Sequence, residues 1–311
     1  MGKLMGVIQY SGKLGTTVGY KGSGGRQNVR VHVDTIKNPK TNGQLVQRMI
    51  CATVGVGVSF MTEILNNAFE GKSFGAESLA YARKLWMNML RTEDAASLSS
   101  TYKYLPKGQK EFICNPYQLS EGRLASPIVR INDPLDGEIL VQGPATLSTS
   151  LTASQLFPDV AVGNQITVLV LLSNEDAVRP VYCRFAFKDD VTAALTQTDA
   201  GFYINPAAID TTKAEGPWSS LQFNTGSNGE FIIGFAEIPN WESLFAAAIL
   251  VSDKERNLRS RTFLVVAGDY DGNGEFAGGQ VYPTYGESSV EVDFPSEWYL
   301  QNSVRPSNAG E

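Results

Sequence analysis

The residues best suited to holding an ion lie near the C-terminal end of the chain, in the run Asp269-Tyr270-Asp271-Gly272-Asn273-Gly274. Asp269, Asp271 and Asn273 match the oxygen ligands at positions 1, 3 and 5 of a calcium loop, with glycine at position 6. Position 12 is Gln280, where such loops carry a bidentate glutamate. Two interpretations follow: a calcium site, and a hairpin turn whose Asp, Asn and Gly residues suit the backbone. The turn accounts for more of the pattern, and no other cofactor is expected.

The chain has few residues that could support histidine- or cysteine-dependent chemistry. His32 is the one histidine, so a catalytic triad or a histidine-ligated metal would depend on it alone. Cys51, Cys114 and Cys183 are odd in number and widely spaced, without a CxxC pair. This pattern argues against a disulfide framework and a structural zinc site, and it suits folding in a reducing cytoplasm. We therefore expect no histidine-dependent enzyme.

Carboxylates and aromatic residues offer two further kinds of chemistry. A hydrolase would need a carboxylate pair, and the sequence does not show whether scattered acids such as Asp210 and Glu215 meet across a cleft. A sugar-binding groove would need exposed aromatic rings. The candidates for such a groove are Tyr203, Trp218, Trp241 and Trp298. Aromatic residues fill the cores of β-sandwiches more often than they line grooves, so core packing is the favoured interpretation.

Positive charge is concentrated at the N-terminal end. The basic residues of this region are Lys3, Lys13, Lys21, Arg26, Arg30, Lys37, Lys40 and Arg48. With one acid among them, residues 1–50 carry a charge of +7, whereas the whole chain carries −6 and the remainder therefore −13. A basic arm on an acidic body indicates an acidic partner for the arm. That partner is either the acidic face of a neighbouring copy or nucleic acid.

The elements that position these residues change in type along the chain. Residues 4–10, 16–20 and 28–33 are predicted to form short strands joined by glycine turns. Thr41 and Gln44 then form a capping box that starts a helical region. Apolar residues at i, i+3 and i+4 spacing predict one helix from Leu45 to Phe69 and another from about Ala76 to Arg91. The first has apolar residues on more than one side, so the surplus must meet the β body or another subunit.

The remainder of the chain has the texture of an all-β protein. The segments with the strongest strand pattern are 127–131, 138–142, 165–172, 181–187, 230–236, 246–251 and 262–267. The run over 165–172 is apolar throughout its centre and is predicted to be a central strand. The predicted fold is α+β: a basic arm (1–40), a helical pair (41–108), a mainly antiparallel β-sandwich (109–300) and a polar tail (301–311).

Four parts of the sequence together resemble an uncharacterised protein family of Bacteroidetes and their phages. They are the Met1-Gly2-Lys3 start, the glycine-rich hairpin Ser11–Gly19, the helix start Asn38-Pro-Lys-Thr with Gln44, Gln47 and Arg48, and the run Tyr117–Gly122. The resemblance implies a basic hairpin, a helical pair and a C-terminal β-sandwich. It also implies a structural component of a virion, and it brings no activity or site residues.

From these observations we expect a non-enzymatic structural protein of a bacteriophage virion, capsid- or tail-associated, that assembles through its arm and helices. Its partners would be other copies of itself, as a homo-oligomer, and other virion proteins, with nucleic acid as a second partner of the basic arm. The alternative is a carbohydrate- or surface-binding β-sandwich of a phage or bacterium. The N-terminal end has no secretory signal pattern, and Glu63 and Asn66 interrupt the apolar run at 50–65. We therefore expect synthesis in the host cytoplasm, no membrane association and a final location in the virion.

Overall fold

A computed structural model describes most of the chain between residues 12 and 283. The described ranges are 12–14, 17–21, 27–31, 42–92, 111–113, 116–133, 137–173, 178–226, 229–236, 243–266, 268–270, 276–279 and 281–283. Antiparallel sheets make up most of this structure, and four α-helices are found in it. The predicted α+β class is therefore confirmed at this level.

The helical region consists of α1 (Asn42–Phe60), α2 (Thr62–Leu65) and α3 (Ala76–Thr92). α1 runs without interruption through Gly55 and Gly57, although glycine has a low helix propensity. The chain leaves helical geometry at Met61 instead, and the hydroxyl of Thr62 there donates to the carbonyl of Val58 at 2.9 Å. The predicted single helix to Phe69 is therefore a long helix followed by one short turn. α3 matches the predicted second helix.

Two antiparallel sheets form the β body. The six-stranded sheet has the order β10-β11-β12-β13-β7-β6. Its strands are β6 (Val129–Asp133), β7 (Glu138–Gln142), β10 (Leu195–Thr198), β11 (Gly201–Ile204), β12 (Leu221–Thr225) and β13 (Glu230–Phe235). The five-stranded sheet has the order β15-β14-β8-β9, and β17 also pairs with β14. Its strands are β8 (Gln165–Ser173), β9 (Val178–Phe185), β14 (Ser243–Asp253), β15 (Leu258–Arg259) and β17 (Val265–Val266).

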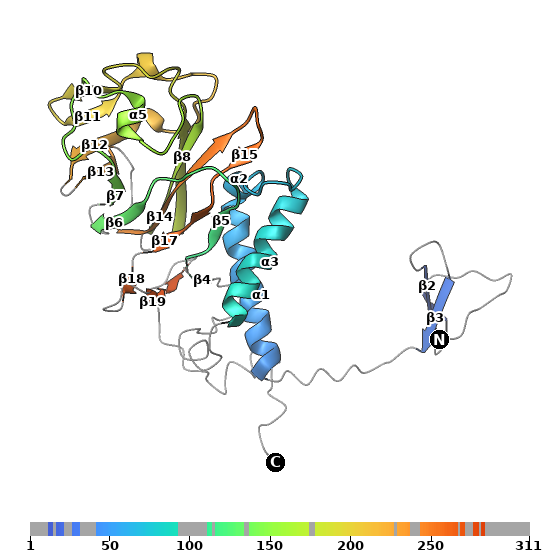
Figure 1. The fold of residues 1–311 in the computed structure, drawn as a ribbon. Helices are drawn as coiled ribbons and strands as arrows, with labels where there is room; N and C mark the ends of the chain where they lie inside the picture. The colour runs from blue at the N-terminus through green and yellow to red at the C-terminus, as the bar shows by residue number, and fades with distance from the viewer. Residues whose placement is uncertain are drawn as a thin grey trace.

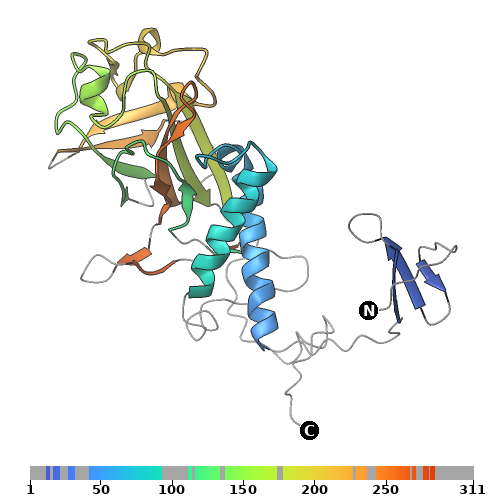
Figure 2. The ribbon, with the colours of Figure 1, turned by 45° about the vertical axis from the view of Figure 1, so that its right-hand side comes forward.

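Smaller elements complete the described structure. Short strand pairs are formed by β5 (Gln118–Ser120) with β16 (Thr262–Phe263), β18 (Gly268–Tyr270) with β19 (Phe276–Gly279), and β4 (Glu111–Ile113) with β20 (Val281–Pro283). The connections contain α5 (Ala153–Leu156), η2 (Pro206–Ala208) and η3 (Trp218–Ser220). At the N-terminal end, β1 (Gly12–Leu14), β2 (Thr17–Lys21) and β3 (Gln27–Val31) form a three-stranded antiparallel ribbon. Figures 1 and 2 both show this ribbon apart from the helices and the two main sheets.

The five-stranded sheet is the middle of three layers, with the six-stranded sheet on one face and the helices on the other (Figure 1). Side chains of β8 alternate between two cores: Val168 and Val170 pack towards the six-stranded sheet, and Leu169 and Leu171 pack towards the helices. This arrangement explains why the strand is apolar at every central position. The sheets are thus sandwich-like, and one of them is covered on both faces.

The helices use their apolar residues on the sheet and on each other. Ile50, Val54, Val58 and Met61 of the first helical region share a core with residues of β8, β14 and α3. On α3, Trp86 is fully buried, stacks on Tyr117 with ring centroids 4.4 Å apart, and donates from Nε1 to the carbonyl of Gln118 at 2.8 Å. Trp86 is therefore a core residue, and the surplus apolar surface predicted for the first helix meets the β body.

A chain of hydroxyl groups from Ser260, Thr262 and Ser126 lies along β14 next to this core. Ser260 Oγ accepts from the Val251 backbone N–H at 2.9 Å and lies 2.8 Å from Thr262 Oγ1. Thr262 Oγ1 in turn contacts Ser126 Oγ at 3.1 Å, and Ser126 donates to the Ile249 carbonyl at 2.6 Å. These bonds fix the segment around β16 to β14. They satisfy polar groups that would otherwise be costly to bury.

Candidate functional site

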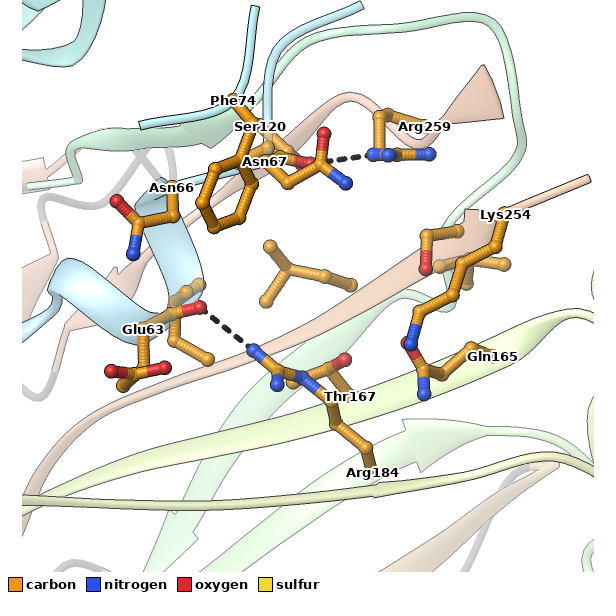
Figure 3. Close-up of a pocket in the computed structure, with 15 residues that line it drawn as sticks. Glu63, Asn66, Asn67, Phe74, Ser120, Gln165, Thr167, Arg184, Lys254 and Arg259 are labelled. Atoms are coloured by element: carbon orange, nitrogen blue, oxygen red, sulfur yellow. Dashed lines mark hydrogen bonds between the residues drawn. The ribbon is translucent and has the colours of Figure 1, made fainter. Parts of the chain in front are cut away.

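A pocket of about 190 Å³ lies where α2 and the loop after it meet one end of the strands β8, β9 and β14 (Figure 3). Its walls come from residues 63–74, from β8 and β9, and from the turn between β14 and β15. The residues that line it are Glu63, Ile64, Asn66, Asn67, Ala68, Phe74, Ser120, Gln165, Thr167, Arg184, Leu250, Val251, Ser252, Lys254 and Arg259. Three of these side chains are cationic and one is acidic, so the lining has a positive balance.

Arg259 holds the loop after α2 against the sheet. Its Nε donates to the carbonyl of Asn67 at 2.6 Å, and its Nη1 donates to the carbonyls of Leu258 at 2.7 Å and Asp253 at 3.3 Å. Its Nη2 donates to the side chain of Asn257 at 3.2 Å. Burial of the guanidinium lowers the pKa of Arg259, while the charges of Glu70 and Asp253 act in the opposite direction. Arg259 is therefore a structural cation with four of its five N–H donors in use.

Arg184 makes a second connection between the helical region and the sheet. From β9 its Nη2 donates to the carbonyl of Glu63 at 2.8 Å, and its Nη1 lies 2.5 Å from a carboxylate oxygen of Glu215. The guanidinium also sits over the ring of Tyr182, 4.9 Å from its centroid. Three of its five N–H donors remain after these bonds.

Lys254 is the third cation of the pocket. It lies in the turn between β14 and β15 and is exposed. Within the part of the chain that the structure describes, its ammonium group makes no hydrogen bond or ion pair. Lys254 and Arg184 therefore both retain the capacity to donate to a bound anion.

The base of the pocket is apolar. Ile64 and Leu250 are each 7% exposed, and Thr167 beside them is buried. Phe74 stands at the rim with 73% of its surface exposed, and Figure 3 shows its ring above the hollow. An apolar base with cations at the side is suited to an anionic molecule that has an apolar part.

Comparisons with known proteins give this chain no relative. No family model, no curated protein and no solved structure matches it. Among the described residues, no helix has the length and apolar character needed to span a membrane.

The predicted calcium loop falls mostly outside the described residues. Asp269 belongs to the backbone of β18, and Asp271 and Asn273 lie beyond the described ranges. β18 and β19 pair in antiparallel fashion on either side of this segment, as a hairpin requires. The described residues contain no group of three or more His, Cys, Asp or Glu side chains arranged to hold a metal. Calcium binding by this loop stays a prediction.

The structure places part of the predicted basic surface. Lys13 on β1, Arg30 on β3 and Arg48 on α1 are exposed, and Lys21 belongs to the backbone of β2. The described ranges do not include Lys3, Arg26, Lys37 and Lys40. The ribbon also exposes Tyr20 by 43% and Val31 by 71%. By register Lys13, Arg30 and Tyr20 share one face of the ribbon, and Val31 lies on the opposite face.

The carboxylates and aromatic residues considered from the sequence have local partners. Asp210 accepts from the hydroxyl of Thr212 at 2.7 Å, which lowers its pKa, and Glu215 pairs with Arg184. Trp218 packs against the core between the sheets, and Tyr203 lies on β11 in the six-stranded sheet. The other two aromatic candidates, Trp241 and Trp298, fall outside the described ranges.

The sequence did not reveal the pocket. Its lining is drawn from positions as far apart as Glu63 and Arg259, and no local motif joins them. One signal was available: Arg184 interrupts the largely apolar stretch Val181–Phe187. A single charge in such a strand indicates either an edge position or a specific partner, and here it has the partner Glu215.

Proposed function

We propose that this protein is a non-enzymatic structural component of a bacteriophage virion that assembles through its N-terminal arm. The observation that carries the proposal is the ribbon β1–β3. It pairs with no other strand of the described chain, and it exposes Lys13, Arg30, Tyr20 and Val31. The strand register puts Lys13, Arg30 and Tyr20 on the same face of the ribbon. A small face with basic and aromatic groups is suited to contact with another molecule.

The size of the ribbon supports a role in contact. Its three strands have three, five and five residues, and sheets this small are marginal without a surface to pack against. The rest of the chain offers an acidic surface, because residues 51–311 carry a charge of −13. The arm of one copy against the body of the next would combine the two. The resemblance to phage proteins inferred from the sequence is what suggests a virion as the setting of this assembly.

The helices have a smaller part in this proposal than the sequence suggested. Their buried apolar residues from Ile50 to Leu90 pack on each other and on β8 and β14. What they offer to a neighbour is their exposed polar side, including Arg48, Arg83 and Lys84. The arm is therefore the main contact that the proposal requires.

The test compares the full chain with a chain that lacks residues 1–40, using light scattering coupled to size exclusion and negative-stain microscopy. The full chain should form oligomers that weaken as salt rises, because exposed charge pairs are screened. The shortened chain should be monomeric with an unchanged melting temperature.

Two matched double variants test whether assembly depends on the charges of the arm or on positive charge anywhere on the surface. Lys13→Glu with Arg30→Glu should weaken assembly, whereas Arg83→Glu with Lys84→Glu on α3 should have little effect. Assembly that survives deletion of the arm would contradict the proposal and move the contact to the β body. Oligomers that appear only with added DNA or RNA would assign the arm to nucleic acid.

A further inference from the structure

The pocket beside α2 has donors without acceptors. Arg184 keeps three N–H groups after its bonds to the Glu63 carbonyl and to Glu215, and the ammonium of Lys254 has no partner in the described chain. In Figure 3 Arg184, Lys254 and Phe74 surround the hollow from three sides. An ordered guanidinium whose remaining N–H groups border an open pocket is suited to a planar, two-oxygen acceptor.

The other half of the pocket has the opposite character. Ile64 and Leu250 form its base, and both are nearly inaccessible to solvent. Phe74 at the rim is among the most exposed large apolar side chains of the described chain. A ligand that covers Phe74 and lies on Leu250 removes apolar surface from water, which an inorganic anion does not do.

We propose that this pocket binds a small organic carboxylate with an apolar body. The carboxylate lies at Arg184, within the field of Lys254, and the apolar body lies on Ile64 and Leu250 beneath Phe74. Both connections that form the pocket, Arg184 to Glu63 and Arg259 to Asn67, are made to backbone carbonyls of the helical region. The cavity is therefore held in shape without a ligand, so binding requires little reorganisation.

Glu63 is the one acid in the lining, so removing its negative charge tests whether the bound ligand is an anion. Its side chain is exposed, and Figure 3 shows it on the opposite side of Arg184 from Lys254. Its backbone carbonyl, and not its carboxylate, accepts the bond from Arg184. Removing this carboxylate leaves the pocket's framework in place while removing a charge that repels an anion.

The probe is benzoate, and benzamide is its uncharged counterpart of the same shape. Binding to the full chain is followed by NMR of methyl-labelled isoleucine and leucine. Benzoate should shift the methyl signals of Ile64 and Leu250 and leave that of Ile204, in the core between the sheets, unchanged. Benzamide should bind roughly tenfold or more weakly, the difference expected when hydrogen bonds to a charged group are lost.

Variants then assign the charge. Lys254→Gln should weaken benzoate binding up to roughly fivefold, as for an exposed charge pair, and Glu63→Gln should strengthen it. Lys84→Gln, on the exposed side of α3, is the matched control and should have no effect. Melting temperatures without benzoate identify any variant that is simply destabilised. Equal binding of benzoate and benzamide would overturn the proposal. So would unmoved Ile64 and Leu250 signals at saturating benzoate, or equal behaviour of the Lys254 and Lys84 variants.

Discussion

Replacing Arg259 by methionine should destabilise the protein through the loss of its guanidinium hydrogen bonds. Methionine keeps most of the length and apolar stem of the side chain but removes the guanidinium. The variant therefore loses the 2.6 Å bond to Asn67 and the 2.7 Å bond to Leu258, along with two longer bonds. The Asn67 bond joins residues 192 positions apart in sequence, so no neighbouring residue can replace it.

The expected magnitude follows from two opposing effects. Each short hydrogen bond from a charged group contributes about 1.5–3 kcal/mol. Burying the guanidinium has a cost of several kcal/mol, which the variant no longer bears. The carbonyl of Asn67 loses its charged donor in the variant. We expect a net loss of about 2–4 kcal/mol in the free energy of unfolding.

Arg261→Met, two residues along the chain, is the control. Arg261 is exposed, and its contact with the ring of Phe263, 5.5 Å from the centroid, is worth about 0.5–1 kcal/mol. Urea unfolding of both variants gives the comparison. Hydrogen exchange should in addition show lost protection at the amides of Glu70 and Gly75, which donate to Glu121 and Asn66. Equal destabilisation by the two substitutions, with this loop still protected, would refute the role given to Arg259.

Three further predictions concern the layers and two titrating groups. Residues 109–311 expressed without the helices should bind the dye ANS and aggregate, because the face of β8 and β14 that carries Leu169 and Leu171 is then exposed to water. A soluble monomer that binds no ANS would show that the helices are not needed to cover this face. In a Cys114→Ser chain at pH 8, iodoacetamide should modify exposed Cys51 and leave Cys183 unmodified, because burial raises the pKa of Cys183 to about 12. Mass spectrometry of the folded protein measures the labelling, and equal labelling of the two cysteines would contradict this. Hydrogen bonds from Arg256 and Glu255 lower the pKa of Asp253, so its stabilising effect is complete above the unfolded pKa near 3.8 and is lost as pH falls through the lower folded value. Unfolding free energies measured from pH 6 to pH 2 should therefore fall less steeply for Asp253→Asn than for the original chain, and parallel curves would refute the assignment.

Sequence patterns predicted the helices and strands whose burial follows one regular pattern along their length. β7 has the predicted bounds, and β8 and α3 differ from prediction by one residue at one end. Each of these has either strict periodicity or continuous apolar character, which local sequence expresses well. β10 and β11 were not predicted, because Leu195–Thr198 is mostly polar and exposed and Gly201–Ile204 is short and begins with glycine. Strands of this kind depend on their neighbours for stability.

The pocket could not be predicted for a related reason. It exists because Arg184 and Arg259 bond to carbonyls of a helical segment more than a hundred residues earlier. Backbone carbonyls are present in every residue, so the sequence carries no signal of which one will accept. The apolar surplus of the first helix was visible in the sequence, whereas its destination on β8 and β14 was decided by packing.

The two-sided burial of the middle sheet has a consequence for how its strands find their alignment. In a sheet with one wet face, a slip by one residue moves apolar side chains into water, and this penalty selects the correct pairing. Here both faces of β8 and β14 are dry, so a slipped pairing would still bury apolar groups. The correct pairing must then be distinguished from slipped pairings by the sizes of the side chains. Small Ala246 and Ala248 lie under the helices, and larger Ile249 and Val251 lie on the opposite face. Two further features favour the correct pairing, because each fits only one alignment of the strands. They are the irregularity between Leu244 and Ala246, and the hydrogen bonds from the hydroxyl groups of Ser126 and Ser260 to β14.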